Sequence, residues 1–280
     1  MSIKVITDST SDLPIELAEQ LGITVVPTNV VFGIEQFKDG TELTADQFYE
    51  RLINGPVHPT TSAPSIGEFI EAFESVGKDA DGIVSINVSS KLSATYNVAV
   101  QAAEQAKLNC PIEVIDSFQA SLGLGMTVIA AAKSANAGAD FETVAEVGRE
   151  AKERSQCVAL FDTLEYLQRG GRIGKARAFL GSILRIKPMI IIKDGEVQPL
   201  GRARTYAKGV AHIEKVAREF GPAEELSVMY STSKEIALEI GETMRSILPE
   251  GTEPFVSRFG PSVGSHVGPG AVGISMLRAK

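Results

Sequence analysis

The chain has 280 residues, of which 44% are hydrophobic, so it can bury the core of two domains or of one large domain. This hydrophobic content excludes an intrinsically disordered chain. Asp and Glu total 35 against 27 for Lys and Arg, and the net charge of −8 argues against nucleic acid as a partner.

The chain carries no pattern that favours a membrane or an oxidising compartment. The most apolar long run, residues 120–135, is interrupted by Gly123, Gly125 and Lys133 and falls short of a membrane span. Cys110 and Cys157 follow no disulfide or zinc-ligand spacing. We therefore expect no stable membrane insertion, a cytoplasmic location and reduced cysteines in apolar surroundings.

Apolar runs of strand length alternate with helix-period segments in the first half of the chain, which is the pattern of a mainly parallel sheet. The predicted strands are Ile3–Thr7, Ile23–Phe32, Gly82–Val88 and Ile112–Asp116. The predicted helix starts are Asp12 followed by Pro14, Thr44 with Gln47, and Ser65 with Glu68. The last two pairs have the spacing of capping boxes.

The segment Ala120–Ala137 predicts a helix that is apolar almost all round and hence buried. Gly123 and Gly125 destabilise a helix, so they require a packing or cavity reason. If the protein holds a long apolar ligand, these glycines are expected to line its tunnel.

The organisation changes around Gln156–Asp162. Pro188–Lys193 and Glu196–Arg204 flank an Asp194–Gly195 turn and predict a hairpin, and helices and strands alternate from there to the end. We therefore expect an α/β protein of two domains. Residues 1–155 form an α/β domain with a mainly parallel sheet, and residues 156–280 form a mixed α+β domain.

Three familiar motifs fail on their predicted context. Residues 260–264 match G-x-S-x-G, but a Gly-rich loop is expected to follow, and no Asp or Glu occurs after Ser262. Residues 268–273 match G-x-G-x-x-G too close to the chain end to open a βαβ unit. Residues 170–175 resemble a P-loop, but the spacing is one short and Ala176 replaces the required hydroxyl.

Hydroxyl side chains gather instead in loops that follow or flank predicted strands. They include Ser9 to Ser11, Thr60 to Ser62, and Ser89 to Thr95. Ligands of open α/β sheets lie outside the carboxyl ends of the strands, so these loops can meet at one rim. Helix capping explains individual Ser and Thr residues equally well, although a helix start after Ser93 would also favour an anion.

Of the three histidines, His266 is the candidate for a functional role. It lies in Gly264-Ser265-His266-Val267-Gly268-Pro269-Gly270, where glycines let backbone approach a ligand and an imidazole can donate to an anion. An incidental loop histidine is the alternative interpretation.

At this point the sequence resembles the DegV family. The matching stretches, in family order, are Asp8–Asp12, Thr61–Pro64, Ser90–Tyr96, Asp116-Ser117, Leu167…Gly170–Ile173, Lys187-Pro188, Gly201…Arg204-Thr205 and His266…Gly268–Gly270. They run nearly end to end. Two positions depart from the usual pattern, Ala63 in place of Gln and Ala94 in place of Gly, and neither departure removes a hydroxyl.

The resemblance implies two α/β domains with a long-chain fatty acid between them, its carboxylate near the junction and its tail in a buried tunnel. It implies no other cofactor and no metal. Carried over by motif, the carboxylate contacts are Thr61, Ser93 and His266, with Ser62 and Thr95 as secondary candidates.

The resemblance also implies a partner. In some bacteria such proteins are lipid-binding subunits of fatty acid kinase, and a separate ATP-dependent kinase phosphorylates the bound carboxylate. Arg172 and Arg204 match the region associated with the kinase or the head group, and ordinary surface charge is the alternative.

Two other functions stay open. The first is an enzyme that acts directly on a small acyl or carboxylate substrate, with Ser93 as nucleophile and His266 as base, oriented by Asp8 or Asp116. The second is a regulatory module that binds another small anion.

Overall fold

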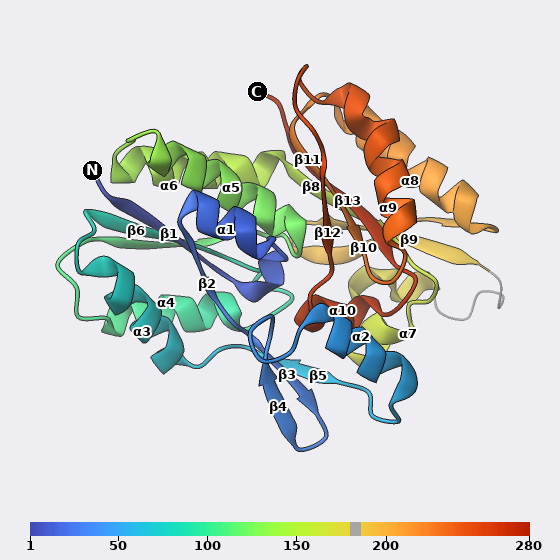
Figure 1. The fold of residues 1–280 in the computed structure, drawn as a ribbon, viewed down its shortest axis with the longest axis horizontal. Helices are drawn as coiled ribbons and strands as arrows, with labels where there is room; N and C mark the ends of the chain where they lie inside the picture. The colour runs from blue at the N-terminus through green and yellow to red at the C-terminus, as the bar shows by residue number, and fades with distance from the viewer. Residues whose placement is uncertain (180–185) are drawn as a thin grey trace.

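The protein is described by a computed structural model, which covers residues 1–179 and 186–280. Two sheets with their helices stand side by side, and a small third sheet projects below the junction between them (Figure 1). This is the two-domain α/β architecture that the sequence predicts. The division at residue 155 stays a prediction, although one sheet ends before it and the other begins at it.

The first sheet is parallel throughout and has the order β2-β1-β6-β7. Its strands are β1 (Ile3–Asp8), β2 (Ile23–Val26), β6 (Gly82–Asn87) and β7 (Ile112–Asp116). The helices of this half are α1 (Ile15–Leu21), α2 (Ala45–Asn54), α3 (Ile66–Gly77), α4 (Thr95–Gln105), α5 (Leu122–Asn136) and α6 (Phe141–Arg154). The predicted capping boxes at the starts of α2 and α3 are confirmed.

The second sheet is mixed, with the order β10-β9-β8-β13-β11-β12, and only β11 and β12 are parallel. Its strands are β8 (Ser155–Leu160), β9 (Lys187–Lys193), β10 (Glu196–Ala203), β11 (Ala223–Tyr230), β12 (Phe255–Arg258) and β13 (Val272–Arg278). Its helices are α7 (Glu165–Arg169), α8 (Tyr206–Phe220), α9 (Lys234–Met244) and α10 (Pro261–Val267). The predicted hairpin is confirmed: Asp194 and Gly195 both have positive φ, as a tight turn between β9 and β10 requires.

The predicted strand Ile23–Phe32 is wrong, because the chain changes sheet within it. β2 ends at Val26, and β3 (Asn29–Phe32) joins β4 (Glu35–Lys38) and β5 (Thr60–Ser62) in the third sheet. Pro27 has no backbone N–H, and the Thr28 N–H bonds Ser9 Oγ at 3.0 Å instead of a strand. The break carries the chain from the first sheet to the junction.

Helix α5 is buried as predicted, since it contacts strands of both large sheets. Its glycines permit that close packing. A Cβ at Gly123 would lie 3.1 Å from Cys157 Cβ, and one at Gly125 would lie 3.0 Å from the Ser11 carbonyl oxygen. Helix α5 is thus held against both halves at distances that a side chain would prevent.

Two local predictions near the junction are also wrong. Asp12 does not open a helix: it has φ 52° at the end of a short 3₁₀ turn, and α1 begins three residues later at Ile15. Residues 261–267 are not loop but the helix α10, started by Pro261 at a position where a missing N–H costs nothing. Both Ser262 and His266 therefore stand on a helix.

Candidate ligand-binding site

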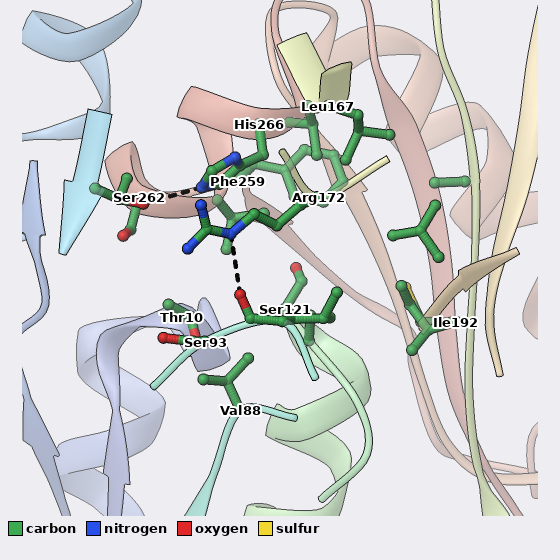
Figure 2. Close-up of a pocket in the computed structure, with 18 of the residues that line it drawn as sticks. Thr10, Val88, Ser93, Ser121, Leu167, Arg172, Ile192, Phe259, Ser262 and His266 are labelled. Atoms are coloured by element: carbon green, nitrogen blue, oxygen red, sulfur yellow. Dashed lines mark hydrogen bonds between the residues drawn. The ribbon is translucent and has the colours of Figure 1, made fainter. Parts of the chain in front are cut away.

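A cavity of about 120 Å³ lies at the junction, where the carboxyl ends of the parallel strands face the mixed sheet and α10. Its wall is apolar on the side of the mixed sheet, where Phe161, Leu167, Ile190, Ile192 and Val197 line it. In Figure 2 the polar side chains of Thr10, Ser93 and Ser262 lie on the side opposite Ile192. The cavity therefore has one polar end and one apolar wall.

Thr61 and His266, which are 205 residues apart, meet at the polar end. Thr61 lies on β5 opposite Val30 of β3, and its Oγ1 is 3.0 Å from His266 Nε2 on α10. Both side chains line the cavity. The third sheet and α10 thus bring together two of the three residues that the sequence singled out.

The His266 imidazole is neutral at pH 7. Burial, followed by the charges of Arg172 and His58, lowers its pKa to about 4. Its Nδ1 has no hydrogen-bond partner among the described residues and packs on Gly170, where a Cβ would lie 2.1 Å from Nδ1. His266 therefore meets Thr61 as a neutral imidazole, without a positive charge.

Ser93 also lines the cavity, in the loop between β6 and α4. Its Oγ is 2.8 Å from the Thr95 Oγ1 and accepts from the Thr95 N–H at 3.3 Å. Because Thr95 can donate both bonds, the Ser93 hydroxyl hydrogen is available to a ligand. Thr95 itself is fully buried behind Ser93 and does not line the cavity, whereas Ser62 does.

The two arginines singled out from the sequence occupy different places. Arg172 lines the cavity, and its Nε donates to the Leu92 carbonyl oxygen at 3.0 Å, one residue before Ser93. Arg204 is exposed just after β10 and takes no part in the cavity wall. Only Arg172 is therefore placed to influence the polar end.

The alternative pairing of Ser93 with His266 as nucleophile and base is not formed. Ser93 bonds Thr95, and His266 bonds Thr61. Neither proposed acid orients the imidazole, since Asp8 accepts from the Val88 N–H at 2.9 Å and Asp116 accepts from the backbone N–H groups of Ser90 and Phe118.

Gly123 and Gly125 do not line this cavity, and the expectation that the segment Ala120–Ala137 lines a ligand tunnel stays a prediction. Neither residue belongs to the cavity wall, which takes Ala120 and Ser121 just before α5 instead. Their role is the close packing of α5 described above. Cys157, expected in apolar surroundings, is buried and lines the cavity as a free thiol.

Four hydroxyls of the wall were missed as ligand candidates: Thr10, Thr28, Ser121 and Ser262. Thr10 was visible within a polar loop, but Thr28 and Ser121 carry no local signal. Ser262 was set aside because its segment was expected to be loop.

Among residues 1–179 and 186–280, no group of three or more His, Cys, Asp or Glu side chains could hold a metal ion.

Within residues 1–179 and 186–280, no helix combines the length and the hydropathy that a membrane span requires.

Comparison with known proteins gives one consistent result. The chain matches the family model of DegV, a family of uncharacterised proteins, over residues 2–279. It is 36% identical to a DegV domain-containing protein of Streptomyces coelicolor over 279 residues, 97% of each chain.

Solved structures of DegV proteins have the same fold as this chain. A DegV family protein from Thermus thermophilus, described by its fatty acid binding, superposes with a TM-score of 0.91 at 33% identity and 100% coverage of both chains. DegV from Bacillus subtilis, described as a fatty acid binding protein, gives a TM-score of 0.89 at 32% identity. That match covers 99% of this chain and 100% of the other.

Proposed function

Because this chain belongs to the DegV family, we propose that it binds a long-chain fatty acid, with the carboxylate at the polar end of the cavity and the tail along the apolar wall. The observation that carries the proposal is the cavity itself. One cavity joins hydroxyl side chains from the first half to a wall of large apolar side chains from the second. Such polarity matches a molecule with one charged end and a long hydrocarbon chain.

The tail supplies most of the affinity. Each methylene removed from water contributes about 0.8 kcal/mol, so a long chain contributes on the order of 10 kcal/mol before the cost of association. The side chains of the apolar wall have no polar groups that require hydrogen-bond partners. Chain length and shape are therefore set by the space between Ala159, Ile192 and their neighbours.

The carboxylate is held by Thr61 and Ser93, and His266 orients Thr61. A neutral imidazole that donates its Nε2–H to Thr61 Oγ1 leaves the Thr61 hydroxyl hydrogen free to donate to the ligand. Arg172 acts on the same end by fixing the backbone of Leu92, beside Ser93. Ser62 is a further contact from β5.

We further propose that the bound carboxylate is presented to a separate ATP-dependent fatty acid kinase, which converts it to an acyl phosphate in the cytoplasm. The family resemblance motivates this role. Arg204, exposed and outside the cavity, is the candidate contact for that kinase, because a guanidinium fork suits phosphate or carboxylate groups of a partner.

Mass spectrometry of organic extracts tests the binding function. Protein purified from a bacterial host should release fatty acid in a nearly equimolar amount, and delipidated protein should take up oleate. An extract without fatty acid, together with no oleate uptake, contradicts the proposal. Turnover of acyl esters by the pure protein would instead favour the enzyme alternative.

A further inference from the structure

A second set of hydroxyls lines the polar end of the cavity, and each is backed by a buried carboxylate. Thr10 donates its hydroxyl to Asp8, and Ser121 Oγ donates to Asp12 Oδ2 at 2.5 Å. Asp8 and Asp12 are 0% and 7% exposed. These two hydroxyls therefore present oxygen lone pairs, not hydrogens, to whatever occupies the cavity.

The third buried carboxylate, Asp39, is joined to the cavity by a chain of hydroxyls. Ser9 Oγ donates to Asp39 Oδ2 at 2.7 Å, and Thr28 Oγ1 lies 3.3 Å from the same oxygen. Thr28 Oγ1 also donates to Ser262 Oγ at 2.9 Å. Because Thr28 and Ser262 both line the cavity, Asp39 is separated from a ligand by hydroxyls alone.

The groups that face Asp39 from the elements around it bring no positive charge. Burial raises the pKa of Asp12 well above its usual value, and Asp8 at the end of β1 adds repulsion to the larger effect of burial on both Asp12 and Asp39. From α2 comes Tyr49, whose buried hydroxyl has no partner among the described residues. From α10 comes the backbone N–H of Ser262, which donates to Asp39 and carries no net charge.

The described cations of this region form no ion pair with the three buried aspartates. Lys38, next in the chain, pairs with Glu68. Arg258 of β12 lies over the Tyr49 ring and pairs with Asp46. Arg172 donates to two backbone carbonyl groups. None of the three buried aspartates forms an ion pair within residues 1–179 and 186–280.

A fatty acid carboxylate that enters this end adds a negative charge beside buried acids that lack a counter-charge. When carboxylates share a buried site, one of them holds its proton far more tightly. We propose that the fatty acid binds together with one proton from solvent, which is held on Asp39 at the end of the Thr28–Ser262 hydroxyl chain. This inference rests on the proposed function.

The hydroxyl chain connects Asp39 to the ligand carboxylate. A protonated Asp39 can donate to Thr28, which donates to Ser262, whose hydrogen then points to the ligand carboxylate. Burial holds the pKa of Asp39 at about 6, so this carboxyl is mostly charged at pH 7 before the ligand arrives. An incoming anion raises that pKa further and draws the proton in.

Calorimetric titration of the full chain with oleate, at pH 7 in two buffers of different ionisation enthalpy, measures the proton count directly. We expect roughly one proton to be taken up per oleate bound, and a dissociation constant that rises by up to about tenfold per pH unit between pH 6.5 and 8. Oleyl alcohol, which has no carboxylate, should bind without proton uptake.

Variants locate the proton. Asp39→Asn should bind oleate with little proton uptake and with an affinity that hardly changes with pH, whereas the exposed Asp79→Asn should behave as the parent. Oleate binding by the parent without proton uptake overturns the inference and leaves the proposed function standing. Undiminished uptake in Asp39→Asn overturns the assignment to Asp39. No oleate binding by the parent defeats the proposed function itself.

Discussion

The two halves of the chain contribute opposite chemistries to one cavity. Before residue 155 the wall is rich in hydroxyls, which come from Thr10, Thr28, Thr61, Ser62, Ser93 and Ser121. After it the wall is mainly large and apolar, formed by Phe161, Leu167, Ile190, Ile192, Val197 and Phe259. The exceptions come chiefly from α10, which returns Ser262 and His266 to the polar end.

This difference follows from the kind of backbone that each half offers. The parallel sheet presents the loops at its strand ends, where Ser and Thr satisfy free N–H groups and stay available to a ligand. The mixed sheet presents a strand face, on which Ile190 and Ile192 of β9 point the same way because side chains alternate. In the proposed function, head-group recognition therefore falls mainly to the first half of the chain and tail binding to the second.

The largest expected effect comes from filling the apolar wall. Ala159→Phe places a ring in the cavity and should exclude about five methylenes, which corresponds to about 4 kcal/mol or roughly a thousandfold weaker oleate binding. Octanoate should be affected much less. Calorimetric titration measures both ligands, and Ala137→Phe on the exposed end of α5 is the control. Parent-like oleate affinity in folded Ala159→Phe would place the tail elsewhere.

The next effect concerns how the free energy of unfolding depends on pH. Asp39 of the first half and His266 of the second half contribute to it in opposite directions. The pKa of Asp39 is raised from 3.8 to about 6, so its contribution to the free energy of unfolding falls as pH rises through that window. The pKa of His266 is lowered from 6.5 to about 4, so its contribution falls as pH drops through nearly the same window. Each amounts to on the order of 3 kcal/mol, and the two oppose each other.

Urea unfolding from pH 7 to pH 4 separates these contributions. Asp39→Asn should lose stability more steeply than the parent as pH falls, because one of the buried acids that oppose the His266 effect is then absent. His266→Asn should lose less, or gain. The parent serves as the common reference for the other buried acids. Parallel pH profiles for all three proteins would show that neither group titrates as described.

A smaller effect is expected at the carboxylate. Thr61→Val and Ser93→Ala each remove one hydroxyl donor, which should weaken oleate binding by about tenfold, or about 1.5 kcal/mol, while the tail keeps the ligand bound. The exposed Thr143→Val on α6 should leave binding unchanged. If Ser93→Ala binds oleate as well as the parent, the head group does not reach the loop before α4.

The smallest effect on lipid binding is expected at Arg204. Arg204→Ala should bind oleate as the parent does and lose acyl-phosphate formation in a reconstituted kinase assay. Arg172→Ala should instead weaken binding several-fold, because Leu92 loses its contact beside Ser93. Equal loss of lipid in both variants would contradict the separate placement of the two arginines.

The sequence by itself determined much of the local structure of this protein. Capping pairs at Thr44 and Ser65, the turn at Asp194–Gly195 and the apolar helix after Ala120 all depend on neighbours within a few residues, and all are confirmed. It also indicated Thr61, Ser93 and His266 through the family resemblance, and each lines the cavity.

Only the tertiary structure decided which of those local signals meet. Pro27 moves the chain to a new sheet and so brings Thr28 beside Ser262, a contact between residues 234 positions apart. Gly125 is a packing position because the Ser11 carbonyl oxygen lies against it. Asp12 was predicted to start a helix, but its side chain instead accepts from the Gly260 N–H at 2.9 Å. Burial and hydrogen-bond partners across the junction are properties of the packed chain, so periodicity and spacing could not have assigned them.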